Sequence, residues 1–210
     1  MGANCCHNVK FEGLNPAYKR ALITVIFINA GMFLVEMPMG FVGQSQALKA
    51  DALDFLGDTF TYALSLYVIG KAGTMRAKAA LLKGLSLSAM GLWVLGSTLY
   101  TVLYLKEPQA FIMGSVGAAA LAANIASVLL LMRFKDGDAN VRSVWLCSRN
   151  DAIGNVMVMI AASGVWATGT GWPDLVVAGI MASIFLSGSV AIIRQARAEL
   201  VDHHRHAAAE

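Results

Sequence analysis

Charged side chains are scarce in this sequence. Only 14% of its 210 residues are Asp, Glu, Lys or Arg, whereas 57% are hydrophobic, and the mean hydropathy is +0.62. A soluble domain usually carries about 25% charged residues, so a soluble protein of this length would have nowhere to bury so much apolar surface. The formal net charge of +3 is too small to indicate a nucleic-acid partner. The composition therefore predicts an integral membrane protein.

Cysteine is also rare, and histidine is absent from the apolar segments. Three cysteines, Cys5, Cys6 and Cys147, do not make a disulfide framework. The four histidines all lie near the two ends of the chain, at His7, His203, His204 and His206. A membrane-embedded metal hydrolase would need a motif such as His-Glu-x-x-His, or a Ser/His pair, inside the membrane. The sequence therefore argues against an enzyme.

Long apolar runs take the place of the missing charge. Each run is close to the ~20 residues that a helix needs to cross a hydrocarbon core of about 30 Å. The connections are short, so consecutive helices should be antiparallel neighbours in a compact bundle. We expect an all-α membrane protein with six transmembrane helices, at residues 19–42, 49–70, 79–104, 109–132, 143–167 and 174–193. The six-helix domain then covers residues 19–197, between tails at 1–18 and 198–210.

Lys and Arg residues are divided unevenly between the two sides of this predicted frame. Of the 16, only Lys49 and Lys106 fall on the side away from the termini, if Lys83 is counted with the connection between the second and third helices. Because Lys and Arg concentrate on the cytoplasmic side, we expect both termini to be cytoplasmic. Interfacial aromatic residues fit this orientation, with Tyr100, Tyr104, Trp166 and Trp172 near the outer surface and Tyr18 and Trp145 near the inner one.

Acidic residues occur inside two of the apolar runs. Placing such a side chain at the centre of a bilayer costs about 2.5–3.5 kcal/mol even on a lenient scale, so these residues indicate a polar cavity or an ion site. Asp54 and Asp58 are four residues apart and share one face of the second predicted helix with Asp51. Cys147 and Asp151 have the same spacing in the fifth.

Two helices that each offer a pair of ligands can together supply four donors to one metal ion. Four carboxylate or thiolate ligands in a tetrahedron suit zinc. Like-charge repulsion and a low dielectric favour the protonated form of clustered carboxylates, so a metal must displace protons in order to bind. Competition between metal and proton for Asp54, Asp58 and Asp151 is the minimum requirement for proton-coupled exchange.

Other interpretations of these polar residues stay open. An aspartate could pair with Arg149, and Cys147 could act as a small buried hydrophobe, which would leave three oxygen ligands. The predicted helix ends also place Asp58 about 20 Å and Asp151 only about 12 Å from the inner surface, a mismatch of about 8 Å. The remaining polar residues of the apolar runs are expected to form interhelical hydrogen bonds, and these are Asn29, Glu36, Asn124 and Asn155.

These motifs resemble those of the cation diffusion facilitators, which are exporters of zinc and related metals. That family has an Asp/His-x-x-x-Asp pair on its second helix and another pair on its fifth, matched here by Asp54 to Asp58 and by Cys147 to Asp151. The entry to the second helix, Ser45-Gln46-Ala47-Leu48, and the turn Gly171-Trp172-Pro173-Asp174 are also similar to the family's. The resemblance covers about residues 11–200. We therefore expect a short form without the family's cytoplasmic C-terminal domain.

The resemblance implies a homodimeric antiporter that exports a divalent metal from the cytoplasm in exchange for protons, by alternating access. Asp54, Asp58, Cys147 and Asp151 would be the four ligands. Cys147 stands where the family usually has His or Asp, and its softer sulfur would favour Zn²⁺, Cd²⁺ or a similar ion such as Co²⁺ over Mn²⁺ or Mg²⁺. The metal is then the transported substrate, and no prosthetic group is expected. Without the C-terminal domain, a dimer would be held by the helices.

Two further features bear on function and location. Cys5-Cys6-His7 and His203-His204-Arg205-His206 have donor atoms that could capture metal at the cytoplasmic side, or they belong to tails with incidental donors. No segment has the form of a targeting sequence, so we expect a multi-pass protein of the cell (inner) membrane. The alternative to a transporter is a non-transporting membrane subunit that binds metal to regulate a partner, although such a subunit needs no acidic cluster within the membrane.

Overall fold

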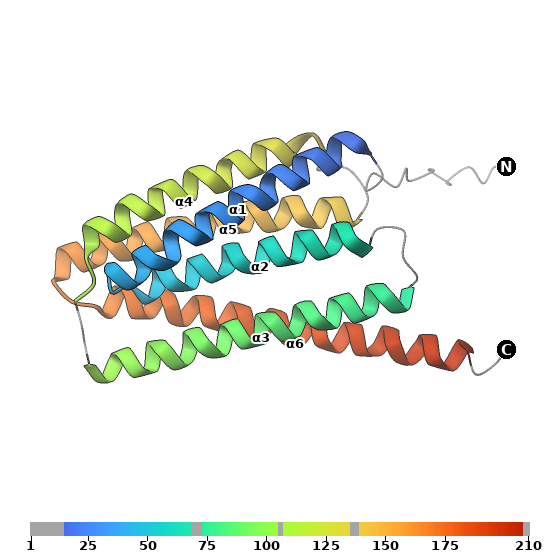
Figure 1. Ribbon diagram of the computed structural model, residues 1–210. Coiled ribbons are helices and arrows are strands. Elements are labelled where there is room, and N and C mark those ends of the chain that lie inside the picture. The colour runs from blue at the N-terminus through green and yellow to red at the C-terminus, as the bar shows by residue number, and fades with distance from the viewer. Residues whose placement is uncertain (1–14, 69–72, 105–106, 135–138, 208–210) are drawn as a thin grey trace, which may run out of the picture.

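The computed structural model describes residues 15–68, 73–104, 107–134 and 139–207, and within these ranges the chain forms helices and short connections without a strand. A 3₁₀ turn, η2 (Met132–Phe134), follows the fourth α-helix. The six α-helices are, in chain order, α1 (Pro16–Val42), α2 (Gln46–Val68), α3 (Gly73–Tyr104), α4 (Ala110–Leu131), α5 (Ala139–Thr168) and α6 (Trp172–Ala207) (Figure 1). The predicted all-α, six-helix architecture is confirmed.

The helices run up and down in a single bundle (Figure 1). We call the end at which α1 begins and α6 ends the terminal end, and the opposite end the far end. The terminal end also holds the last residue of α2 and the first residue of α3. Helices α3 and α6 pack against each other along their length, whereas α1 packs mainly on α2 and α4 mainly on α5. The α3–α6 pair therefore forms one side of the molecule.

Local sequence explains where α1 begins. Asn15 has an extended backbone, and its side-chain oxygen accepts a hydrogen bond of 2.9 Å from the amide of Ala17. Pro16 follows as the first helical residue, where its missing amide hydrogen costs nothing and its fixed φ suits the helix. This is a side-chain cap that satisfies one of the free amides at the start of the first apolar run.

Five of the six described helices are long and apolar enough to cross a membrane by length and composition. Helix α2 has 23 residues but is not among them, because it contains Lys49, Asp51, Asp54 and Asp58. It is shielded by its neighbours, since it packs against α1, α3, α5 and α6. The outer surface of the bundle is correspondingly apolar, and large side chains such as Phe111 are exposed on it. Such a surface fits a lipid environment and not water.

Helix α6 continues well beyond residue 193, through the segment predicted as a tail. The apolar run ends near Arg194, but the next residues are good helix formers, and Gln195 donates a 3.0 Å hydrogen bond to Glu199 one turn later. The end of an apolar run marks the end of the hydrocarbon layer, and a helix can continue into water. The side chains of His203, His204 and His206 lie outside the described part of the structure, as do Cys5, Cys6 and His7.

The aromatic residues predicted for the two surfaces behave differently. Those assigned to the outer one, Tyr100, Tyr104, Trp166 and Trp172, are exposed near the far end of the bundle. Tyr18, assigned to the inner surface, lies in the first turn of α1 at the terminal end, but its ring is fully buried and does not face the surroundings of the bundle as an interfacial residue would. It packs edge-on against Phe134, with 5.5 Å between ring centroids. Its ring fills the core where α1 meets the end of α4.

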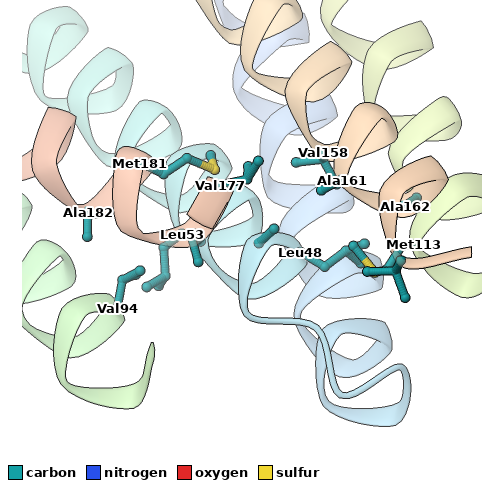
Figure 2. Close-up of a cluster of buried hydrophobic side chains, with 14 of the residues drawn as sticks. Leu48, Leu53, Val94, Met113, Val158, Ala161, Ala162, Val177, Met181 and Ala182 are labelled. Carbon is teal, nitrogen blue, oxygen red and sulfur yellow. The ribbon is translucent and has the colours of Figure 1, made fainter. Parts of the chain in front are cut away.

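Two hydrophobic clusters hold the bundle together, one in each half. The far cluster joins α2, α3, α4, α5 and α6 through buried side chains that include Leu48, Leu53, Val94, Met113, Val158, Val177 and Met181 (Figure 2). The terminal cluster joins only α1, α2, α4 and η2, with Trp145 of α5 packed against it, through Tyr18, Ala21, Leu22, Val25, Tyr62, Leu131 and Phe134. No residue of α3 or α6 is among these described members of the terminal cluster. The α3–α6 pair is therefore bound to the other helices mainly at the far end.

Candidate metal site

Helices α2 and α5 bring the three predicted aspartates together. Asp151 lies within hydrogen-bonding reach of both Asp54 and Asp58. With Phe55 and Asn124, the three carboxyl groups line one narrow space. Two carboxyl groups can form a hydrogen bond only if one of them carries a proton. The cluster is thus a place where protons and a cation compete for the same oxygens.

The predicted mismatch in depth between the two helices disappears. Ten residues separate Asp58 from the last residue of α2, and twelve separate Asp151 from Ala139, the first residue of α5. At 1.5 Å per residue these spans are about 15 Å and about 18 Å. The error arose because α5 begins four residues earlier than its apolar run. Its first turns are polar and were assigned to a loop.

The arrangement is not a closed coordination shell. Among the described side chains, no three His, Cys, Asp or Glu residues form a ready-made metal-binding group. Cys147 belongs to α5, four residues before Asp151, but its side chain lies outside the described part of the structure. The described site therefore offers the oxygens of Asp54, Asp58 and Asp151, with the amide of Asn124 beside them. These are oxygen donors of the kind that divalent cations accept.

A larger cavity of about 560 Å³ leads away from the aspartates between α2 and α5 on one side and α3 and α6 on the other. Its polar lining comprises Asp54, Asp58, Thr61, Lys83, Ser86, Asn150 and Asp151. The apolar wall is contributed largely by α6, with residues such as Ile184 and Ile192. From the aspartates the lining continues along α2 to Thr61 and along α6 to Ile192, so the cavity extends toward the terminal end. The cavity lies between the α3–α6 pair and the other helices, and no described residue of α3 or α6 belongs to the terminal cluster.

Lys83 occupies a different place from the one predicted. It was counted with the connection between the second and third helices, but it lies ten residues inside α3. This is about 15 Å from the start of that helix, and the next residue, Gly84, packs against Ile193 of α6. Its ammonium group is close enough to Asp58 to interact electrostatically with it. The cation count on the terminal side of the membrane is reduced accordingly.

Asp174 fixes the far end of α2. Its carboxylate, only 1% exposed, accepts hydrogen bonds from the Ser45 hydroxyl at 2.6 Å and from the backbone amides of Gln46 at 2.7 Å and Ala47 at 3.0 Å. The Ser45 hydroxyl in turn accepts a 2.9 Å hydrogen bond from the amide of Leu48. A carboxylate at a helix N-terminus satisfies free amides and interacts favourably with the helix dipole. Asp174 thereby ties α6 to the helix that carries Asp54 and Asp58.

Further polar residues surround the site. Tyr62 lies within hydrogen-bonding reach of Asp58, and its hydroxyl is 3.4 Å from the Ser148 hydroxyl. On the far side of the site, Glu36 of α1 faces Asp51 of α2, and both are buried. Asn155 was predicted to form an interhelical hydrogen bond, but both atoms of its buried amide lack a partner within the described part of the chain. That prediction is wrong for Asn155.

Sequence reasoning missed three residues that the structure places at or around the site. Asn124 was assigned to helix packing, although an amide in the otherwise apolar run 110–131 was a visible signal. Lys83 falls within the predicted helix 79–104, but it was counted with the preceding connection because Lys71, Arg76 and Lys78 lie close before it. Asp174 had no local signal for its role, since its partner Ser45 is 129 residues away.

The fold and the site together define a class of protein. A helical membrane bundle with acidic side chains gathered in the wall of an internal cavity is typical of membrane proteins that bind cations. The family model of the cation efflux transmembrane domain matches residues 22–201. The chain therefore belongs to the cation efflux family, which confirms the resemblance noted in its sequence.

Individual relatives are distant. The chain is 25% identical over 196 residues to a protein named zinc transporter ZitB from Escherichia coli K12, covering 87% of this chain and 63% of that protein. It is 25% identical over 202 residues to a protein named cadmium, cobalt and zinc/H(+)-K(+) antiporter from Bacillus subtilis 168, covering 89% of this chain and 62% of that protein. The chain thus spans less than two thirds of the length of the relatives that it matches.

Proposed function

We propose that this chain is a secondary active transporter that exports a divalent transition metal from the cytoplasm in exchange for protons. Zn²⁺ is the first candidate, with Cd²⁺ and Co²⁺ next. The observation that carries the proposal is the meeting of Asp54, Asp58 and Asp151 in the wall of a cavity within a membrane bundle. A non-transporting regulatory subunit would need a binding site, but it would not need a cavity that extends from the site toward one end of the bundle. The names of the relatives supply the metals and the exchanged ion.

The ligand set of the proposal is Asp54, Asp58, Cys147 and Asp151. Asp54 and Asp58 lie on adjacent turns of one face of α2, and Cys147 and Asp151 have the same four-residue spacing on α5. Three oxygens and one sulfur satisfy the four-coordinate preference of zinc. A thiolate in that set also favours thiophilic metals over Mn²⁺ and Mg²⁺.

The two halves of the bundle supply a route for export. The far half is closed by the cluster of Leu48, Val177, Met181 and their neighbours, whereas the cavity extends from the aspartates toward the terminal end as far as Thr61 and Ile192 (Figure 2). If the terminal end is cytoplasmic, as the distribution of Lys and Arg predicts, this is the conformation that loads metal from the cytoplasm. Release on the other side then requires the α3–α6 pair to close the cavity and the far cluster to open.

Proton exchange follows from the same oxygens. The carboxyl groups of Asp54, Asp58 and Asp151 are near enough to one another to share protons when no metal is bound, and a divalent ion must displace those protons. A proton gradient can then drive metal outward, because protonation on the far side favours release of the metal there. Two copies of the chain, joined through their helices, form the proposed assembly in the cell membrane.

The direct test is zinc accumulation by inside-out membrane vesicles with an acidic lumen. The native chain should accumulate zinc, and collapse of the proton gradient should abolish accumulation. Asp58→Asn keeps the size of the side chain but removes a charged ligand, so transport should fall by at least about a hundredfold, comparable to losses seen when an essential polar group is removed. Glu199→Gln is the matched control, since Glu199 lies on the exposed end of α6 away from the cavity.

Accumulation that survives in Asp58→Asn would show that the acidic cluster is not the transport site. Zinc binding by the native chain without accumulation of zinc, cadmium or cobalt would favour the regulatory subunit. Accumulation that needs a potassium gradient and does not depend on the proton gradient would mean that the exchanged ion is K⁺ and not the proton.

A further inference from the structure

Lys83 is a charged residue of the cavity wall that the proposed transport cycle does not yet use. It lies on α3, facing across the cavity the two helices that carry the aspartates. The acidic groups that line the same cavity are Asp54, Asp58 and Asp151, and no acidic residue of α3 or α6 is among the described lining residues. Lys83 interacts electrostatically with Asp58 in particular.

A lysine within a membrane helix needs a compensating environment, since an unpaired charge there is costly. Lysines near helix ends often extend to the membrane surface with their long side chain. Lys83 lines the same cavity as the acidic cluster, and the residue after it, Gly84, packs against Ile193 of α6. The cluster and the lysine therefore stabilise each other when no other cation is present.

We propose that Lys83 is a tethered cation that competes with the transported metal for the cluster formed by Asp54, Asp58 and Asp151. This inference rests on the proposed function, because it assigns Lys83 a role at the same site. The ammonium group lowers the free energy of the metal-free cluster by attraction. It raises the free energy of the metal-bound cluster by repulsion of a divalent ion. Both effects weaken metal binding, so Lys83 keeps affinity low enough for the metal to leave.

Metal binding to the purified full chain in detergent tests this directly, with zinc titrated in competition with a chelating dye. Lys83→Met removes the charge but keeps the aliphatic stem, so zinc should bind about tenfold more tightly or more, given the strength of charge interactions in partly screened sites. Lys83→Gln should change affinity in the same direction. Lys83→Arg keeps the charge and should bind zinc like the native chain. Lys78→Met is the matched control, because Lys78 is exposed and does not line the cavity.

Transport supplies a second readout that a merely structural role would not produce. In vesicles, Lys83→Met should lower the zinc concentration that gives half-maximal uptake and also lower the maximal rate, because tighter binding slows release. Equal or weaker zinc binding in Lys83→Met and Lys83→Gln would overturn the inference, as would the same gain in affinity in Lys83→Arg. If the native chain binds no more zinc than Asp58→Asn does, the proposed function itself fails. This outcome differs from a native chain that binds zinc with an affinity that Lys83→Met leaves unchanged.

Discussion

Replacement of Asp174 by alanine should destabilise the protein more than most single changes in it. The carboxylate accepts three hydrogen bonds, from the Ser45 hydroxyl and from the amides of Gln46 and Ala47, and it is buried. Asp174→Ala leaves two backbone amides at the start of α2 without a partner. Each unsatisfied buried donor costs about 1–3 kcal/mol, and the favourable interaction with the helix dipole is lost as well. We expect a loss of about 3–5 kcal/mol, of which a water entering the space would recover part.

Thermal unfolding of the purified chain in one detergent measures this loss. For a domain of this size, 1 kcal/mol corresponds to about 2–4 °C, so Asp174→Ala should lower the Tm by roughly 6–20 °C. Asp174→Asn keeps one acceptor oxygen, so its Tm should lie between the Tm of the native chain and that of Asp174→Ala. Glu199→Ala is the control, since Glu199 is exposed and its bond from Gln195 is worth only about 0.3 kcal/mol. A Tm for Asp174→Ala within the range of this control would refute the capping argument.

Two other substitutions separate packing from metal chemistry. Gly40→Ala should lower the Tm, because an added Cβ would lie 2.8 Å from the Lys49 side chain and 3.1 Å from its backbone nitrogen. In the same helix, the added Cβ of Gly31→Ala meets nothing within 4 Å, so this variant should be neutral or slightly stabilising. Equal Tm values for the two would contradict the close approach of α1 and α2. Cys147→Ser should weaken Cd²⁺ binding more than Zn²⁺ binding in a dye-competition titration, because a hydroxyl is a harder donor than a thiolate. An unchanged Cd²⁺ to Zn²⁺ affinity ratio would mean that Cys147 is not a ligand.

The aspartates were predictable because a membrane makes them conspicuous. Asp54, Asp58 and Asp151 stand in apolar runs, and their spacing places each on a known helix face, so composition and periodicity were sufficient to group them. Their proximity was harder to establish, because the predicted start of α5 put Asp151 too near the surface. The first turns of a membrane helix can be polar, and their hydropathy is then the same as that of a loop. Only the fold shows that α5 begins at Ala139.

Two other roles lay beyond sequence reasoning for different physical reasons. Whether Lys83 extends to the membrane surface or lines a cavity depends on how α3 packs against the other helices, which its own sequence does not show. Asp174 acts on amides 128 and 127 residues away. Such a contact depends on how α6 packs against the start of α2. No local pattern encodes it, although the turn Gly171 to Asp174 was recognisable as a motif.

The lengths of α3 and α6 have a mechanical consequence. Helix α6 has 36 residues and α3 has 32, or about 54 Å and about 48 Å, whereas a hydrocarbon core is about 30 Å thick. Both helices have their extra turns at the terminal end, and both are joined to the rest of the bundle chiefly at the opposite end by the cluster in Figure 2. The pair can thus rotate as a unit about its attachment to the other helices near the far end. A small force on the projecting turns near Val201, from any binding partner, would exert a large torque on the wall that closes the cavity.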